Sequence, residues 1–157
     1  MERFLRGKLK DGRFQNLTAT TSKTMKAIKG RGNKTTEWPF RMHLVRQGIR
    51  GWRMHPAAVT GKPDFFFASH RVAVFIDGCF WHGCPKCGHV PKNNREFWAA
   101  KLTRNKERDA GTTMALRREK IAVLRFWEHQ VKEDCGACVS KLSRTLEKRT
   151  RGRRTSR

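Results

Sequence analysis

The segment at residues 77–87, Asp-Gly-Cys-Phe-Trp-His-Gly-Cys-Pro-Lys-Cys, constrains the fold of this chain more than any other part of it. It follows an unbroken apolar run at residues 72–76, which is typical of a buried strand. The segment therefore begins where a strand leaves the core, and rigid scaffolds place reactive groups at such points. Three thiols and one imidazole at this spacing favour a metal site over three unrelated core cysteines.

The amino-acid composition indicates the class of partner that the protein binds, but it does not indicate the reaction that the protein catalyses. The 157 residues are enough for one domain with a sizeable core. Lys and Arg number 36 against 13 Asp and Glu, a net charge of +23, which favours nucleic acid as the partner. No apolar window is long enough to span a bilayer, and no apolar stretch follows the basic N-terminus, so we expect neither a membrane span nor a secretory signal. A reducing cytoplasm then favours zinc over disulfides for the clustered thiols.

The order of the apolar runs predicts a single α/β domain in which helices pack on a mixed sheet. We expect a helix from residue 35 or 36 to residue 47, and strands at residues 52–54, 64–68, 72–76 and 121–126, with the second and third strands forming a hairpin. A helix is predicted at residues 94–119, where Gly111 is a potential break, and another from Val131 onward. Residues 1–24 are predicted to be a basic flexible arm, 25–147 the folded domain, and 148–157 a basic disordered tail.

Two carboxylates, Asp64 and Asp77, stand at the beginning and the end of the predicted hairpin. Pro63 forces an extended backbone before it, and a carboxylate entering a buried strand is costly unless it is paired or holds a cation. If the strands pair, the two carboxylates converge at one end of the sheet, where hard oxygen ligands suit Mg²⁺. A turn Asp at each position is the simpler alternative, since Asp-Gly is a common turn pair.

His82 is the single imidazole inside the cysteine segment. Three roles are open to it, namely zinc ligand, general base and structural donor. Beside Mg²⁺ and a basic groove, it would be able to deprotonate a water for attack on phosphorus.

The five cysteines offer two zinc groupings. The first consists of Cys79, Cys84, Cys87 and His129. The second combines two C-x₂-C pairs, as in zinc ribbons but with a far longer gap, and consists of Cys84, Cys87, Cys135 and Cys138. Cys135 and Cys138 also fall on the apolar stripe of the last helix, where thiols act as small hydrophobes. We therefore favour the first grouping.

Phe80 and Trp81 lie between a thiol and His82. Exposed aromatics beside phosphate-binding cations are able to wedge into or stack on bases, and burial in the core is an alternative of equal weight. Basic side chains near these motifs are candidate phosphate contacts, although each taken singly also fits a solvated surface: Lys62, Lys92, Arg95, Lys101, Arg104 and Lys106.

These motifs resemble those of the very short patch repair endonucleases, bacterial nucleases that nick DNA at T:G mismatches. The resemblance extends over residues 20–135. Its most specific blocks are Gly61-Lys62-Pro63-Asp64 and the segments at residues 74–85, 91–98, 105–109 and 123–129. Residues 22–28 resemble the opening segment of the family.

The resemblance implies a restriction-endonuclease-like core of the PD-(D/E)XK type, a central mixed sheet flanked by helices, with one structural zinc. The implied zinc ligands are Cys79, Cys84, Cys87 and His129. The implied catalytic set is Asp64 as the Mg²⁺ carboxylate, His82 as the catalytic base and Glu37 as a supporting acid. We further expect Asp77 or its neighbouring backbone to assist the metal. His82 takes the place of the core Lys that is usual in this fold. Residues matching Met25, Phe80 and Trp81 insert beside the mismatched pair in this family.

The function predicted in this way is Mg²⁺-dependent nicking of one DNA strand 5′ to the thymine of a T:G mismatch, in very short patch repair. The expected partners are double-stranded DNA with that mismatch, a cytosine DNA methyltransferase as functional companion, and mismatch-repair proteins. We expect a monomer in the bacterial cytoplasm, associated with the nucleoid. The alternatives are a restriction-type endonuclease of the same fold that cuts an intact site, and a non-catalytic zinc-containing DNA-binding protein.

Overall fold

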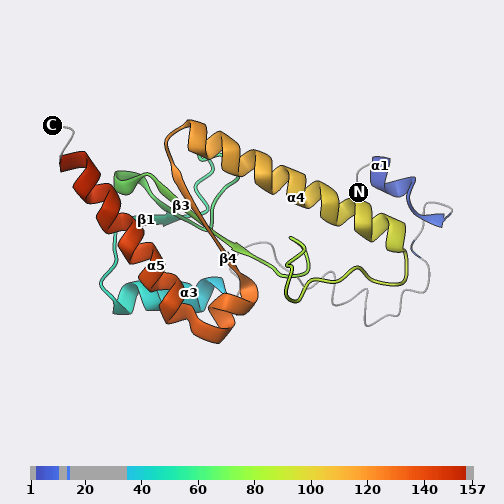
Figure 1. Cartoon of the computed structure of the whole chain (residues 1–157), viewed down its shortest axis with the longest axis horizontal. Coiled ribbons are helices and arrows are strands. Elements are labelled where there is room, and N and C mark those ends of the chain that lie inside the picture. The colour runs from blue at the N-terminus through green and yellow to red at the C-terminus, as the bar shows by residue number, and fades with distance from the viewer. Residues whose placement is uncertain (1–2, 11–13, 15–34, 155–157) are drawn as a thin grey trace.

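The computed structural model describes residues 3–10, 14 and 35–154, and these residues form the mixed α/β architecture predicted from the sequence (Figure 1). The elements follow the expected order, with an additional short helix near the N-terminus. They are α1 (Arg3–Arg6), α3 (Glu37–Arg46), β1 (Trp52–Met54), β2 (Phe65–Phe67), the 3₁₀ turn η2 (Ala68–His70), β3 (Val72–Asp77), α4 (Arg95–Arg118), β4 (Ala122–Trp127) and α5 (Glu128–Arg154).

The four strands form one sheet in the order β1-β2-β3-β4. β2 and β3 pair antiparallel as the predicted hairpin, with Phe65 opposite Val74, and η2 closes the turn with Arg71 at a φ of 52°. β4 pairs parallel to β3. α4 is therefore the crossover that returns the chain to the edge of the sheet where β3 begins. The parallel pairing sets Asp77 opposite Trp127, and the C-terminal ends of β3 and β4 therefore lie side by side.

Both faces of the sheet are covered, by α3 and α5 on one side and by α4 on the other (Figure 1). β3 alternates accordingly, because Val72 and Val74 pack with α3 and α5 while Ala73 and Phe75 pack with Leu116 of α4. The larger core layer contains Phe40, Leu44, Phe65, Phe67, Phe126, Val131, Cys135, Cys138, Val139, Leu142 and Leu146. With both faces covered, the functional groups gather at the ends of the strands.

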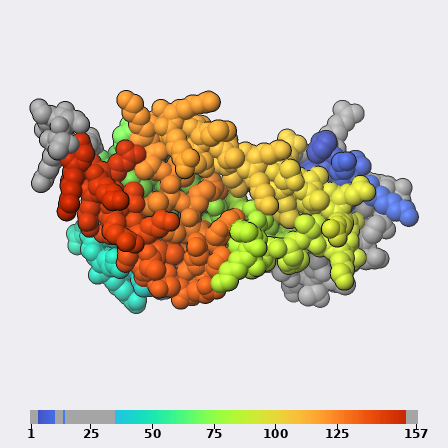
Figure 2. All heavy atoms as spheres, in the orientation of Figure 1, coloured from blue at the N-terminus to red at the C-terminus, as the bar shows by residue number. Residues whose placement is uncertain are grey.

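α4 runs unbroken from Arg95 to Arg118, so the predicted break at Gly111 does not occur. A lone glycine costs a helix only about 1 kcal/mol relative to alanine. Gly111 is exposed, and the helix is held on both sides of it, by Leu116 in the core and by Phe97 and Trp98 against the N-terminal segment. The first half of α4 extends past the sheet, and together with the segment after β3 it forms a lobe of the elongated molecule (Figures 1 and 2).

Both ends of the chain carry regular structure where the sequence analysis predicts an arm and a tail. Within residues 1–24, Leu5 and Leu9 are buried against Phe97 and Trp98, although most of that range lies outside the described residues. α5 continues through residues 148–154, where disorder was expected. The apolar stripe ends at Leu146, so the sequence gives no sign of this extension. None of the helices in the described ranges is long and apolar enough to cross a membrane.

Candidate active site

A cleft of about 420 Å³ opens beside the start of β2 and the ends of β3 and β4. Its walls include all four residues predicted to take part in catalysis, Glu37, Asp64, Asp77 and His82. Further charged residues of the lining come from the loop before β2 and from α4, β4 and α5, and they are Lys62, Arg108, Asp109, Arg125 and Glu128. The carboxylate of Asp64 and the imidazole of His82, from separate segments, thus face one space.

The loop at residues 61–64 sets Asp64 in place immediately before β2. Gly61 has a φ of 76°, and a Cβ at this position would lie 2.2 Å from Cγ2 of Thr112, so only glycine fits against α4. Lys62 also has a positive φ, 50°, and its backbone N–H donates to the carbonyl of Val59 at 2.9 Å. Pro63 is fully buried. The Gly-Lys-Pro-Asp sequence therefore makes a rigid turn between α4 and the sheet.

The carboxylate of Asp64 is tied to the backbone of β3. Its Oδ2 accepts a hydrogen bond from the N–H of Ile76 at 2.6 Å. Burial raises the pKa of Asp64 to about 6, and the charges of Glu37 and Asp77 add to the rise, against the lowering effect of the Ile76 hydrogen bond and of His55. A bound cation would hold such a carboxylate in its ionised form, so the oxygen donors here fit a hard divalent ion such as Mg²⁺.

Asp77 forms a bidentate ion pair with Arg125 of the neighbouring strand β4. The Nε and Nη2 atoms of Arg125 donate to its two carboxylate oxygens at 2.6 Å and 2.7 Å. The same guanidinium lies over the ring of Phe75 at 4.7 Å and reaches to within 3.4 Å of Asp109. Because both of its oxygens are engaged, Asp77 shapes the wall of the cleft through Arg125.

His82 is oriented by Asp109 of α4. Its Nδ1 lies 2.5 Å from Oδ2 of Asp109 and 3.6 Å from Oδ1 of Asp77. Burial alone would raise the pKa of Asp109, but the hydrogen bond to His82 and the charges of His82 and Arg125 lower it below its ordinary value. With Nδ1 facing this ionised carboxylate, Nε2 is the ring nitrogen left to meet a water molecule or a substrate.

The segment that carries His82 is a series of tight turns fixed to α4. Asn105, one helical turn before Asp109, is buried and donates to the carbonyl of Trp81 at 2.8 Å. The N–H of His82 donates to the carbonyl of Gly78 at 3.1 Å, and the N–H of Cys84 donates to that of Cys79 at 2.9 Å. Asn105 and Asp109, on one face of α4, therefore fix the position of the turn that carries His82 and the orientation of its ring.

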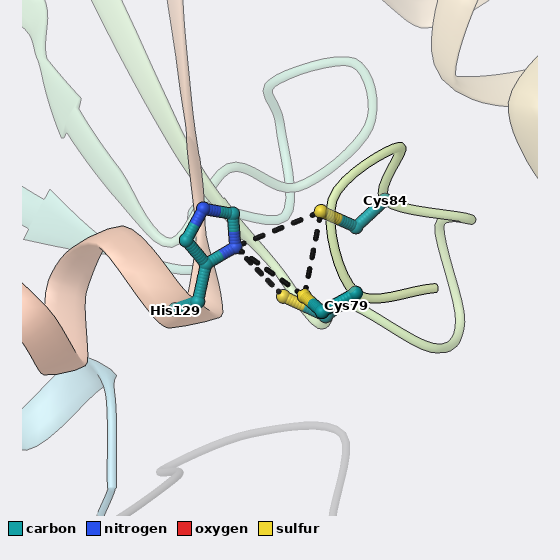
Figure 3. A group of neighbouring side chains, drawn as sticks. Cys79, Cys84 and His129 are labelled. Atoms are coloured by element: carbon teal, nitrogen blue, oxygen red, sulfur yellow. Dashed lines mark hydrogen bonds between the residues drawn. The ribbon is translucent and has the colours of Figure 1, made fainter. Parts of the chain in front are cut away.

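The favoured grouping of metal ligands comes together at the start of α5. Figure 3 shows His129 pointing towards the thiols of Cys79 and Cys84. Its Nδ1 lies 3.3 Å from the sulfur of Cys79, 3.6 Å from that of Cys84 and 3.5 Å from that of Cys87, and the sulfurs of Cys84 and Cys87 are 3.5 Å apart. A tetrahedral ion with bonds of about 2.3 Å to sulfur and 2.0 Å to nitrogen separates its ligand atoms by roughly 3.5–3.8 Å, so the four side chains fit a zinc ion.

The chemistry of the thiols also favours a cation between them. The hydrogen bond with Cys79, together with desolvation and the neighbouring Cys84, raises the pKa of Cys87 to about 12. A metal ion bound beside Cys87 would favour its thiolate form, which the neighbouring thiols otherwise oppose. Gly88 is required here as well, since a Cβ on it would lie 2.5 Å from the carbonyl oxygen of Cys84.

The second grouping of cysteines does not form. Cys135 and Cys138 are buried in the core layer between the sheet and α5, among Val131, Val139 and Leu142. Burial raises the pKa of both thiols, to about 11 for Cys135, as expected for small hydrophobic side chains.

Phe80 and Trp81 are half-buried in an aromatic cluster at the start of α4. The ring of Phe80 lies 5.0 Å from that of Trp81 and 5.3 Å from that of Trp98. Leu5, Leu9 and Phe97 belong to the same cluster, a second and smaller core. Both aromatics therefore rest on a support from α4, and each keeps a partly exposed edge.

Three of the six candidate phosphate contacts line hollows of the surface. Lys62 lines the catalytic cleft. Lys92 and Arg95 line a separate hollow of about 630 Å³, beside Lys8 and Lys10 of the N-terminal segment. Met25, for which the sequence predicts insertion into DNA, lies outside the described residues.

Several polar residues of the site were not identified from the sequence as functional. Arg125 had a usable signal, because it is the one charged residue in the apolar run at 121–126 and a buried charge needs a partner. Asn105 and Asp109 begin and end one of the blocks that carry the family resemblance and share a helical face, but the sequence does not connect that face to His82. His55 follows a strand of only three residues and gives no signal at all.

Comparison with known proteins gives a consistent result. A family model described as DNA mismatch endonuclease Vsr matches residues 16–87. The type II nicking enzyme V.NaeI of Lentzea aerocolonigenes is 41% identical over 128 residues, which cover 78% of this chain and 76% of that protein. The type II nicking enzyme V.NmeDIP of Neisseria meningitidis serogroup C is 39% identical over 79% of this chain and 84% of its own length. The DNA mismatch endonuclease Vsr of Escherichia coli K12 is 37% identical over 70% of each chain.

A charged cleft at the strand ends of a mixed α/β fold, in a chain whose relatives nick DNA, defines a hydrolase that cuts DNA internally. DNA is accordingly its partner, in agreement with the net charge of +23. The chain belongs to the Vsr family of DNA mismatch endonucleases.

Proposed function

We propose that this endonuclease nicks one DNA strand 5′ to the thymine of a T:G mismatch, by hydrolysis that depends on Mg²⁺. The observation that supports the proposal most is the presence of Asp64, His82 and Asp109 around one cleft, in a member of the Vsr family. We also propose that the core is of the PD-(D/E)XK type and that residues 25–147 make up the catalytic domain.

Asp64 is the proposed ligand of the catalytic cation, with Glu37 as a second acid nearby. The buried position that raises the pKa of Asp64 makes its ionised form depend on a positive partner. When bound, Mg²⁺ would stabilise the charge that develops on the phosphate oxygens. Asp77 supports the site indirectly, because it holds Arg125 between itself and Asp109.

His82 is the proposed general base. The carboxylate of Asp109 at Nδ1 orients the ring and balances the charge that it gains, and Nε2 takes the proton from the attacking water. Arg125 and Lys62 add positive charge to the wall of the cleft, where the phosphate of the cleaved strand would lie.

The aromatic cluster is the proposed mismatch reader. Phe80 and Trp81 stand on the same turn as His82, so insertion of either ring beside a base pair would occur next to the cleft. Met25 is proposed to insert into the duplex together with these rings. Lys62, Lys92 and Arg95 are proposed to bind phosphates, which would position the duplex without reading its sequence.

Cys79, Cys84, Cys87 and His129 are proposed to hold one structural zinc ion, as their spacing and donor types allow. The zinc would join the segment after β3 to the start of α5. We further propose that the protein acts as a monomer, with a cytosine DNA methyltransferase as its functional companion, since deamination of methylated cytosine produces T:G pairs.

The second candidate function is cleavage of an intact site, as by a restriction-type endonuclease. It is supported by the relatives that are named type II nicking enzymes. A non-catalytic DNA-binding protein does not fit a chain with these relatives. The two activities differ in their substrate, so a panel of end-labelled duplexes, each matched or with one T:G pair in varied sequence contexts, separates them.

Nicking of only the T:G duplexes, on the thymine strand and only with Mg²⁺, is the expected result. Cutting of matched duplexes at equal rates would contradict mismatch specificity. Asp64→Asn is the control for contaminating nucleases, because it should retain DNA binding and lose nicking. Cleavage without Mg²⁺, or by this variant, would contradict the role of the cation.

A further inference from the structure

His55 lies between two of the acidic residues of the catalytic cleft. It directly follows β1, and its backbone N–H approaches the carbonyl of Asp64 at 3.4 Å, which extends the β1–β2 ladder by one pair. Cross-strand neighbours of this kind place their side chains within contact distance. The imidazole and the Asp64 carboxylate are therefore held together by the sheet.

The two nitrogens of His55 have different surroundings. Nε2 lies 2.8 Å from Oε2 of Glu37, which is a hydrogen bond. Nδ1 lies 3.8 Å from Oδ1 of Asp64, which is too long for one. When Nε2 carries the N–H that is donated to Glu37, Nδ1 presents its lone pair towards the carboxylate of Asp64.

A divalent cation between Nδ1 of His55 and Oδ1 of Asp64 would be bound by both atoms. Two atoms that bind the same divalent ion at about 2.1 Å each lie roughly 3.0–4.2 Å apart, and the separation of 3.8 Å falls within that range. The ligand atoms of Glu37, His55 and Asp64 all lie within 4.8 Å of one another. A carboxylate on the outer nitrogen of a ligating histidine is a common means of fixing its ring.

The backbone of His55 supports this picture. Its φ of 46° is in the left-handed region, which residues other than glycine adopt rarely, and it precedes Pro56, which also disfavours such a conformation. Conformations of this type persist where the surroundings fix them, and they cluster at functional sites. The side chain is also mostly buried, with 15% exposed.

We propose that His55 is a direct ligand of a divalent cation, through Nδ1 and together with Asp64, with Glu37 fixing the ring from its other side. One imidazole among carboxylates gives a mixed nitrogen and oxygen site, which favours Mn²⁺ over Mg²⁺ more than an all-oxygen site does. The inference rests on the proposed function in one respect, namely that Asp64 is a ligand of the cation in both proposals.

Two substitutions separate a ligand from a residue that only positions Glu37. In His55→Gln, the amide reaches about as far as Nε2, so the contact with Glu37 is kept and the ligand at the Nδ1 position is lost. In His55→Asn, the shorter amide keeps an oxygen near the Nδ1 position and loses Glu37. His70→Gln, at the opposite end of β2, is the matched control.

Mn²⁺ binding to the zinc-loaded protein without DNA would be measured by electron paramagnetic resonance, with Mg²⁺ as competitor. We expect His55→Gln to bind Mn²⁺ about 10- to 100-fold more weakly, with a smaller loss for Mg²⁺. His55→Asn should lose less Mn²⁺ affinity than His55→Gln, and His70→Gln should match the wild type. Spin-echo spectra of bound Mn²⁺ should show coupling to an imidazole nitrogen, and this coupling should vanish in His55→Gln.

Three results would overturn the inference: no nitrogen coupling in the wild type, unchanged Mn²⁺ affinity in His55→Gln, or a greater loss in His55→Asn. Thermal unfolding without added Mn²⁺ or Mg²⁺ checks that each variant is folded. Nicking assays on the same preparations keep the two proposals apart. Active nicking with Mn²⁺ bound away from His55 would overturn only this inference, whereas nitrogen-coupled Mn²⁺ without nicking of any duplex would count only against the proposed function.

Discussion

Replacing Asp64 with Asn should remove nicking and at the same time stabilise the cation-free protein at neutral pH. The reason is that burial raises the pKa of Asp64 from 3.8 to about 6, so the folded state disfavours the ionised carboxylate. Asn has nearly the same shape without the charge, and its side-chain oxygen is still able to accept the hydrogen bond from Ile76. The substitution therefore removes an unfavourable charge and keeps the local geometry.

The size and the pH dependence of the effect follow from the shift. Below about pH 3 the carboxyl is protonated in both the folded and the unfolded chain, and the variant should gain little. Between pH 4 and pH 6 the unfolded chain ionises first, so the wild type loses stability as the pH rises. Above pH 6 the difference is constant, and a shift of about two units corresponds to roughly 3 kcal/mol. We expect an observed gain of about 1–3 kcal/mol at pH 8.

Urea unfolding of zinc-loaded protein at pH 4 to pH 8, without added Mg²⁺, measures this difference. Glu107→Gln is the control for the change in net charge, because Glu107 is exposed on α4, and its effect should stay within about 0.5 kcal/mol. Saturating Mg²⁺ should stabilise the wild type and not Asp64→Asn. An Asp64→Asn variant that is less stable than the wild type at pH 8, or a difference that does not change with pH, would refute the argument.

Three further predictions concern the other parts of the site. His82→Ala should slow single-turnover nicking by about 10²- to 10⁴-fold with DNA binding unchanged, and an unaltered rate would exclude His82 as the base. Arg125→Met should reduce stability in urea by about 3–5 kcal/mol, because it leaves the buried carboxylate of Asp77 without its partner, and a loss below about 1 kcal/mol would contradict that role. Cys79→Ser should lose its zinc, measured by atomic absorption, and should unfold more readily than Cys135→Ser, whose thiol only packs in the core; a stable variant that lacks zinc would argue against the metal site.

Most of the fold could be predicted from the sequence, because its main elements have a clear period. The apolar run at 72–76 and the triple phenylalanine at 65–67 identify the hairpin, and the register sets Phe65 opposite Val74 as that pairing requires. Gly111 misled the prediction, since glycine propensity is a local term and the packing of Leu116 and Trp98 on either side outweighs it.

Some residues of the candidate site could likewise be predicted from the sequence, and others could not. Asp64, His82 and the three cysteine ligands belong to short motifs, so their spacing in sequence reveals them, whereas the fourth zinc ligand, His129, lies 42 residues after Cys87. Asp109, Arg125 and His55 act through contacts between elements that are far apart in the chain, 27 residues between His82 and Asp109 and 48 between Asp77 and Arg125. The parallel pairing of β3 with β4 and the docking of α4 bring Arg125 and Asp109 to their partners, whereas the β1–β2 pairing and α3 bring His55 to Asp64 and Glu37.

The interleaving of the zinc ligands with the catalytic segment has a physical consequence. His82 is enclosed in the sequence between Cys79 and Cys84, both of which face His129 at the start of α5. The N–H of Cys79 also donates to Glu128 at 3.2 Å, so the same turn is attached twice to the end of β4. Asn105 and Asp109 attach it to α4 from the other side. Fixed from both sides, the turn has little freedom to move His82, and a zinc ion in this position would therefore set the geometry of the base as well as the stability of the fold.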